Sequence, residues 1–305
     1  MNITVVIPVY NGEKFIGKAI DSVLNQSYLP YEIIVVDDGS NDGTYQFVKL
    51  NYPDIIIVKQ FNQGPSSARN FGVREATGNW ITFLDADDQW MPNIILNYVN
   101  FLLNKSDLRW CCTPYLIENQ NSKRHIIYNG SQLKNDIIDN VFLAYKDFKF
   151  KVVAELISSC SVIIHKEIFE KVGLFDCNLK RGEDIDFWFR IALHYPKIGY
   201  TKEIGFKYLD INSDSITKTE QEVENIKFQI FRINKTWSYN EQKVIPNPYA
   251  KHVLNNWCFR VLKSIVKKKQ MEFVKLFSDG VTQNLNRRNK IIISSINFFR
   301  KKIKI

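Results

Sequence analysis

Short apolar runs alternate with amphipathic stretches through the first hundred residues of the chain. The runs are rich in β-branched residues, which predicts buried strands at 3–9, 32–38, 55–60 and 80–85. Apolar residues recur at helical spacing between them, which predicts helices at 13–26, 44–50, 66–76 and 93–103. Strands alternating with helices predict an α/β fold, in which helices cover both faces of a mainly parallel sheet.

The pattern is more mixed after residue 105. Further strands are predicted at 108–118, at 158–165 and within 198–211, and short helices at 166–173 and 182–195. From about residue 218 the pattern is helical and then strongly basic. We therefore expect an α/β domain at 1–217 and a basic helical extension at 218–305.

Polar side chains gather just after each of the first four predicted strands. The carboxyl ends of parallel strands meet at one edge of a sheet, where open α/β sheets bind ligands. We therefore expect these clusters to share one site. In strand order, they contain Tyr10 and Glu13, Asp37 and Asp38, Arg69, and Asp85, Asp87 and Asp88.

Composition excludes several classes of protein. At 45% hydrophobic and 24% charged residues the chain is expected to be globular. Five cysteines without C-x-x-C spacing indicate neither a disulfide framework nor a zinc site, and they suit a reducing cytoplasm. The chain shows neither the pattern of a signal peptide nor a run of 18 apolar residues, so we expect no leader and no spanning helix.

The stretch "FLDADDQW" ends an apolar run in three carboxylates, Asp85, Asp87 and Asp88. Like charges this close repel, and a cation between them relieves the repulsion. Mg²⁺ and Mn²⁺ prefer carboxylate oxygens and bridge substrate phosphates, so a metal–diphosphate site is one interpretation. A solvated acidic turn is the other, with Asp88 as the cap of the next helix.

Two further groups could serve the same site. Arg69 could contact a diphosphate, or it could form a salt bridge between helices. Glu183 and Asp184 open a predicted helix, where acids are favourable through the helix dipole alone. If they face the metal site, one of them could act as a general base for an incoming hydroxyl.

Four segments together resemble family 2 glycosyltransferases of the GT-A fold. They are "VVIPVYNGEKFIGKAIDSVLNQS", "EIIVVDDGSNDGT", "NQGPSSARNFGVREATGNWITFLDADD" and "VGLFDCNLKRGEDIDFWFRIA". The resemblance covers roughly residues 1–215. It implies an inverting transfer of one sugar from a nucleotide sugar, usually UDP-linked, to an acceptor hydroxyl, assisted by Mn²⁺ or Mg²⁺.

The resemblance also implies roles for single residues. The general base would be Asp184, with Glu183 beside it orienting the acceptor. Asp85 and Asp87, separated by Ala86, match the D-x-D motif, and Asp87 is the expected metal ligand. The positions that match nucleotide-sugar-binding residues are Pro8, Tyr10, Glu13, Asp37, Asp38, Arg69, Asp85, Ala86 and Asp87.

The chain departs from the family in one segment. Many relatives carry an Arg-x-His segment there, and this chain has Asp210 and Asn212 instead, which puts a diphosphate contact in doubt. The Gln-x-x-Arg-Trp signature of processive synthases is absent after Glu183 and Asp184, which favours one sugar per event.

The basic character lies at the end of the chain. Residues 251–305 hold fourteen Lys and Arg against two acids, whereas the whole chain carries +9. Helices on an anionic membrane and the solvated face of a helical bundle both fit this pattern, and nucleic acid fits it less well. Relatives that act on lipid-linked or lipopolysaccharide acceptors suggest a cytoplasmic enzyme, peripheral on the inner membrane, that builds a bacterial surface glycan.

Two alternatives belong to other classes. A catalytically inactive scaffold that binds nucleotide sugars or glycans would share the fold, although the intact acids argue against it. A sugar-phosphate nucleotidyltransferase would need a Gly-rich triphosphate loop after the first strand, and "PVYNGEKF" has one Gly and one Lys.

Overall fold

The computed structural model describes residues 1–119, 124–128, 136–141, 157–179 and 181–209, together with Ala250, Asn255 and Cys258. The chain divides into two compact units, Met1–Ile211 and Asn212–Ile305. Asp210, Asn212 and almost all of the basic extension lie outside the described residues, so the expectations for them stay predictions. Within the described residues, no helix combines the length and the apolar character that crossing a membrane requires.

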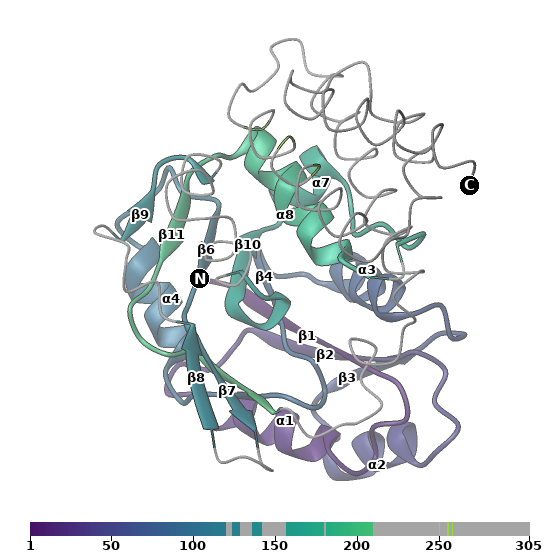
Figure 1. Ribbon diagram of the computed structural model, residues 1–305. Helices are drawn as coiled ribbons and strands as arrows, with labels where there is room; N and C mark the ends of the chain where they lie inside the picture. Colours follow the sequence, from purple (N-terminus) through teal and green to yellow (C-terminus); the bar gives the residue numbers. More distant parts are fainter. Residues whose placement is uncertain are drawn as a thin grey trace, which may run out of the picture. The chain divides into compact units, whose positions relative to one another are not determined.

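An eight-stranded mixed sheet forms the centre of the first unit (Figure 1), with the order β3-β2-β1-β4-β10-β6-β11-β9. Strands β1 to β4 pair in parallel, as predicted, and β10 lies antiparallel between β4 and β6. The strands are β1 Ile3–Val9, β2 Glu32–Asp37, β3 Ile56–Lys59, β4 Trp80–Phe83, β6 Trp110–Cys112, β9 Ile137–Ile138, β10 Val162–His165 and β11 Ile198–Tyr200.

Helices cover both faces of this sheet. They are α1 Ile16–Leu24, α2 Thr44–Asn51, α3 Pro65–Glu75, α4 Ile94–Leu102, α7 Glu167–Val172 and α8 Glu183–His194. Alternate residues of β1, such as Val5 and Ile7, share one core cluster with α1, α2 and α4. On the opposite face, Gly72 of α3 packs on Val6, and Phe83 of β4 stacks edge-on against Phe169 of α7. The predicted layered architecture is therefore confirmed.

A second, four-stranded sheet was not expected. Its order is β5-β12-β7-β8, with β5 Gln89–Trp90, β12 Phe206–Leu209, β7 Tyr115–Asn119 and β8 Arg124–Tyr128. The prediction of one strand over 108–118 is wrong, because β6 and β7 belong to different sheets. Pro114 separates them, since it has no N–H to donate to a sheet ladder.

The segment 158–165 is also a strand only in part. Its first residues form a capped 3₁₀ turn, η1 Ser159–Ser161, in which the side chains of Ser158 and Ser161 each bond the other residue's backbone. Val162–His165 then continues as β10, next to β4. The turn consequently lies beside the carboxyl end of β4.

We predict that Gly72→Ala destabilises the first unit by about 1–3 kcal/mol, because the added methyl group collides with the Val6 side chain in a packed layer. Chemical denaturation would measure the change. Arg74→Ala, on the exposed side of the same helix, is the control and should change stability by less than about 0.5 kcal/mol. Equal effects of the two substitutions would contradict the close packing of α3 on β1.

Candidate functional site

The loops that follow β1 and β2 are tied together at the expected edge of the sheet. The backbone N–H of Asn11 donates to the hydroxyl of Ser40 at 2.9 Å, and that of Gly12 donates to the hydroxyl of Thr44 at 2.8 Å. The carboxylate of Glu13 accepts from the N–H of Gly43, just before α2, at 3.1 Å. Glu13 thus links the first loop to the start of α2.

Asp37 and Asp38 are both buried at the end of β2. Asp37 accepts from the N–H of Ser40 at 2.8 Å. The carboxylate of Asp38 accepts three hydrogen bonds, from the Gln60 side chain at 2.6 Å and from the N–H groups of Gln63 at 2.9 Å and Gly64 at 2.8 Å. Asp38 therefore shapes the loop between β3 and α3.

The other two residues predicted for the first loop differ in exposure. Pro8 is buried within β1, opposite Val36 of β2. Tyr10 follows β1 directly, and its side chain is 47% exposed. An aromatic ring at this position is accessible to a planar ligand such as a nucleobase.

Arg69 joins two acidic segments that are far apart in the sequence. Its Nη2 lies 2.6 Å from Oδ1 of Asp85, which follows β4, and its Nη1 lies 3.3 Å from Oε1 of Glu183, the first residue of α8. Arg69 is buried, and its guanidinium lies 5.8 Å from the centre of the Phe175 ring. One buried cation thus places the D-x-D turn and the Glu183–Asp184 pair in one site.

The carboxylates of this site are not fully balanced by Arg69. Burial raises the pKa of Asp87 above its ordinary value, the negative charge of Asp85 raises it further, and Arg69 opposes both effects. Burial and then the charge of Asp184 raise the pKa of Glu183, again against the effect of Arg69. The site therefore favours an additional positive charge.

The donor atoms fit a hard divalent cation, because carboxylate oxygens are the ligands that Mg²⁺ and Mn²⁺ prefer. Within the part of the chain that the structure describes, Asp85, Asp88 and Cys160 place one donor atom each within 4.8 Å of one another. Asp87, the expected ligand, is not one of these three. Burial raises the pKa of the Cys160 thiol well above its usual range, so this sulfur stays protonated and suits such a cation poorly.

Asp88 does not cap the next helix, so that prediction is wrong. Helix α4 begins at Ile94 after Asn93. Asp88 is instead buried, and its Oδ2 lies 3.5 Å from Sγ of Cys160, which can donate to it. The N–H of Asp88 bonds to the carbonyl of Asp85 at 3.0 Å, so Asp88 belongs to the turn after β4, and β5 separates it from α4 along the chain.

Glu183 and Asp184 lie where the sequence places them, in the first turn of α8. Gly182 precedes them in the left-handed region, at φ 65°, which glycine adopts without strain. The carboxylate of Glu183 points to Arg69, whereas Oδ1 of Asp184 accepts from the N–H of Ile185 at 2.7 Å. The two acids therefore have different surroundings, although they are adjacent in the sequence.

Two residues of the site were missed by the sequence reasoning. Gln60 holds Asp38, and Cys160 contacts both Asp85 and Asp88. Neither belongs to a recognisable motif. Cys160 reaches the site only because β10 pairs with β4, and that pairing cannot be read from local periodicity.

A family model and the similar proteins of known sequence all indicate the same family. The sequence model described as "Glycosyl transferase family 2" matches residues 4–173. An uncharacterized glycosyltransferase of Rickettsia typhi is 34% identical over 208 residues, which cover 67% of this chain and 63% of that protein. The minor teichoic acid biosynthesis protein GgaA of Bacillus subtilis is 28% identical over 67% of this chain and 46% of its own length. The chain spans about half to three fifths of the first curated relatives' length.

Solved structures share the fold. TarS residues 1–349 of S. aureus, in complex with UDP-GlcNAc, superimpose with a TM-score of 0.73 at 18% identity, covering 96% of this chain and 84% of that one. The mannosyltransferase PcManGT of Pyrobaculum calidifontis, in complex with GDP-Man and Mn²⁺, gives 0.54 at 16% identity, covering 97% of this chain and 84% of that one. The expected GT-A fold is confirmed.

We predict that Arg69→Met lowers the free energy of unfolding by about 1–3 kcal/mol at neutral pH, because it leaves the partly buried carboxylates of Asp85 and Glu183 without their partner. The loss should shrink as the pH falls. Protonation removes the unpaired charges, and the pKa of Glu183 is raised even with Arg69 present.

Urea denaturation at pH 7.5 and pH 5 would measure this loss, with Arg74→Met on the exposed side of α3 as the control. A loss of equal size at both pH values would show that Arg69 acts by packing and not by charge.

Proposed function

The chain belongs to glycosyl transferase family 2, and we propose that it is a glycosyltransferase that transfers one sugar from a UDP-linked donor to a hydroxyl group with inversion at the sugar carbon. The observation that carries the proposal is the double ion pair of Arg69. It joins Asp85, on the side expected to hold the donor diphosphate, to Glu183, on the side expected to receive the acceptor.

In the proposed reaction Asp184 takes the proton of the acceptor hydroxyl, and Glu183, fixed by Arg69, orients that hydroxyl. The acceptor oxygen then forms a bond to the anomeric carbon while the bond from that carbon to the diphosphate oxygen breaks. The nucleoside diphosphate leaves with the bonding electrons. The displacement needs no covalent enzyme intermediate, because the acceptor oxygen would attack on the side of the anomeric carbon opposite to the leaving diphosphate.

Asp87 and Asp85 would hold Mn²⁺ or Mg²⁺, which when bound supplies a Lewis acid that neutralises charge on the departing diphosphate. Two observations support this assignment. Burial and then the negative charge of Asp85 raise the pKa of Asp87, and a cation bound there would offset both effects. Asp85 is already paired with Arg69, so this carboxylate can orient a diphosphate and a cation together.

The nucleoside would bind against Tyr10, Pro8 and Asp38. Tyr10 offers an exposed ring for stacking on the base. Asp38 would act chiefly through the loop that it holds, because three hydrogen bonds from the chain already occupy its carboxylate. Glu13 would act in the same way, by fixing the start of α2.

The donor and acceptor classes are supported by the relatives. TarS is described in complex with UDP-GlcNAc, whereas PcManGT is described with GDP-Man, so the uridine donor is our proposal for this chain. GgaA is named for teichoic acid biosynthesis, which supports a glycan or lipid-linked saccharide as the acceptor. With its basic end, the chain would then work on the cytoplasmic face of a membrane.

A thermal-shift panel of nucleotide sugars with Mn²⁺ tests the class and the donor together. We expect a rise in melting temperature with one or a few UDP-sugars, and a smaller one when Mn²⁺ is replaced by a chelator. GDP-sugars and nucleoside triphosphates are the controls. No shift with any nucleotide sugar would overturn the proposed activity, and a shift with a triphosphate alone would favour a nucleotidyltransferase.

We predict that Asp87→Asn lowers the affinity for Mn²⁺ at least tenfold and raises the stability of the metal-free protein at neutral pH. The pKa of Asp87 is raised, so its ionised form destabilises the fold. The gain should disappear as the pH falls through the folded pKa towards the ordinary value of 3.8, because wild-type Asp87 is then also protonated.

Titration of free Mn²⁺ and urea denaturation at two pH values would measure the two effects. Asp107→Asn is the control, since Asp107 is an exposed carboxylate that pairs with Lys197. It should leave the affinity for Mn²⁺ unchanged. A metal-free Asp87→Asn variant less stable than the wild type at neutral pH would contradict the predicted charge imbalance.

A further inference from the structure

Cys160 lies beside the D-x-D turn because of the way two strands pair. β10 runs antiparallel to β4, with Ile163 opposite Thr82 and His165 opposite Trp80. Because the two strands are antiparallel, η1, which directly precedes β10, lies next to the carboxyl end of β4. Cys160 is the central residue of η1, and its side chain is directed at the turn that follows β4.

The thiol of Cys160 contacts both ends of this turn. Its Sγ accepts from the backbone N–H of Asp85 at 3.2 Å, and it lies 3.5 Å from Oδ2 of Asp88, to which the S–H can donate. The backbone bond from the N–H of Asp88 to the carbonyl of Asp85 closes the same turn at 3.0 Å. The two residues between these contacts, Ala86 and Asp87, are thus held from both sides.

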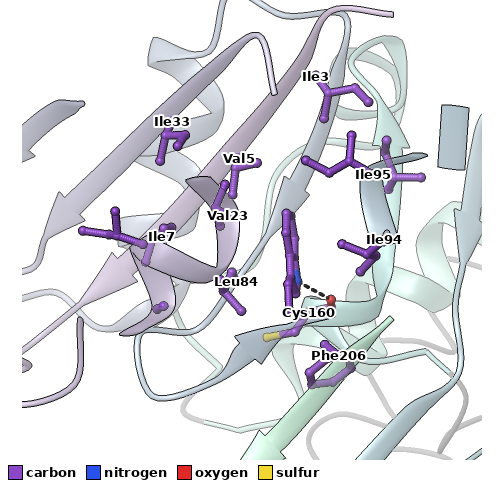
Figure 2. Packing of buried hydrophobic residues seen from close by; sticks show 14 of the residues in the cluster. Ile3, Val5, Ile7, Val23, Ile33, Leu84, Ile94, Ile95, Cys160 and Phe206 are labelled. Atoms are coloured by element: carbon purple, nitrogen blue, oxygen red, sulfur yellow. Dashed lines mark hydrogen bonds between the residues drawn. The ribbon is translucent and has the colours of Figure 1, made fainter. Parts of the chain in front are cut away.

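Cys160 cannot move away from the turn without breaking other contacts. Its side chain is 1% exposed, and its carbonyl oxygen accepts from the indole N–H of Trp90 at 3.2 Å, the bond drawn as a dashed line in Figure 2. The 3₁₀ turn around it is fixed by the reciprocal bonds of Ser158 and Ser161. A rigid element therefore carries the thiol.

We propose that Cys160 is a positioning residue that sets the shape of the turn Asp85–Asp88, and with it the direction in which Asp85 and Asp87 present their carboxylates. The proposal rests on the proposed function, in which these carboxylates hold the metal and the diphosphate. The thiol acts on the turn through hydrogen bonds, whereas the hard cation takes oxygen ligands.

The experiment compares Cys160→Ala and Cys160→Ser with Cys111→Ala in the full chain. Cys111 is the matched control, because it is equally buried, lies on β6 beside β10, and bonds the carbonyl of Cys112 instead of the turn. Loss of one buried sulfur should cost both alanine variants similar stability.

The first measurement is the dissociation constant for Mn²⁺, from titration of free Mn²⁺ without nucleotide. We expect Cys160→Ala to weaken binding about 10-fold or more, as loss of a residue that orients metal ligands does. Cys160→Ser should recover most of the affinity, since a hydroxyl also donates and accepts. Cys111→Ala should bind like the wild type, and the same affinity in Cys160→Ala would overturn the proposal.

The second measurement needs no metal. Hydrogen exchange of the segment 84–90 in the metal-free protein should be faster in Cys160→Ala, close to the wild type in Cys160→Ser, and unchanged in Cys111→Ala. The wild type could bind no Mn²⁺ while hydrogen exchange is still faster in Cys160→Ala. The metal part of the proposed function would then be wrong, but the role of Cys160 in fixing the turn would be supported. Unchanged hydrogen exchange in Cys160→Ala would overturn the proposal that Cys160 fixes the turn.

A Cd²⁺ titration distinguishes positioning from direct ligation. Cd²⁺ binds thiolate sulfur far better than Mn²⁺ does, so a sulfur ligand would make Cys160→Ser lose much more Cd²⁺ affinity than Mn²⁺ affinity. The positioning role predicts similar changes for both ions. A selective loss of Cd²⁺ binding would replace the proposal by a direct ligand role.

Discussion

The rest of the site depends on the ion pairs that the buried guanidinium of Arg69 forms. It pairs with Asp85 after β4 and with Glu183 at the start of α8, and it lies over the ring of Phe175. A buried arginine needs carboxylate partners to remain in the fold, and these carboxylates need the arginine. Arg69 and Glu183, 114 residues apart in the chain, are thereby held in one place.

One cation does not balance all the acids that surround it. Burial first, and then the neighbouring charges of Asp85 and Asp184, raise the pKa values of Asp87 and Glu183, and Arg69 offsets only part of this. Such an arrangement is costly for a merely structural cluster, but it suits a site that receives positive charge together with its substrate. The same imbalance explains why removing one carboxylate should stabilise the metal-free protein while it weakens binding.

The conspicuous acids of the sequence divide into two groups in the structure. Glu13, Asp38 and Asp88 are occupied by hydrogen bonds within the chain, and they form the frame of the loops. Asp85 instead pairs with Arg69, and Asp87 lies close enough for the charges of Asp85 and Arg69 to act on its pKa. Motif spacing identifies all of these acids as candidates. It does not show which of them hold the loops and which act on the substrate, because that role depends on which hydrogen-bond donors the fold brings close to each carboxylate.

The sequence by itself determined the parallel strands, the helices between them and the edge at which the polar residues meet, because periodicity and turn chemistry act over a few residues. Tertiary structure decided the second sheet and the antiparallel insertion of β10 beside β4. Those pairings join segments tens of residues apart, and no local pattern encodes them. The pairing of β10 with β4 brings Cys160 to the D-x-D turn, and the ion pair with Arg69 joins Glu183 of α8 to the same site.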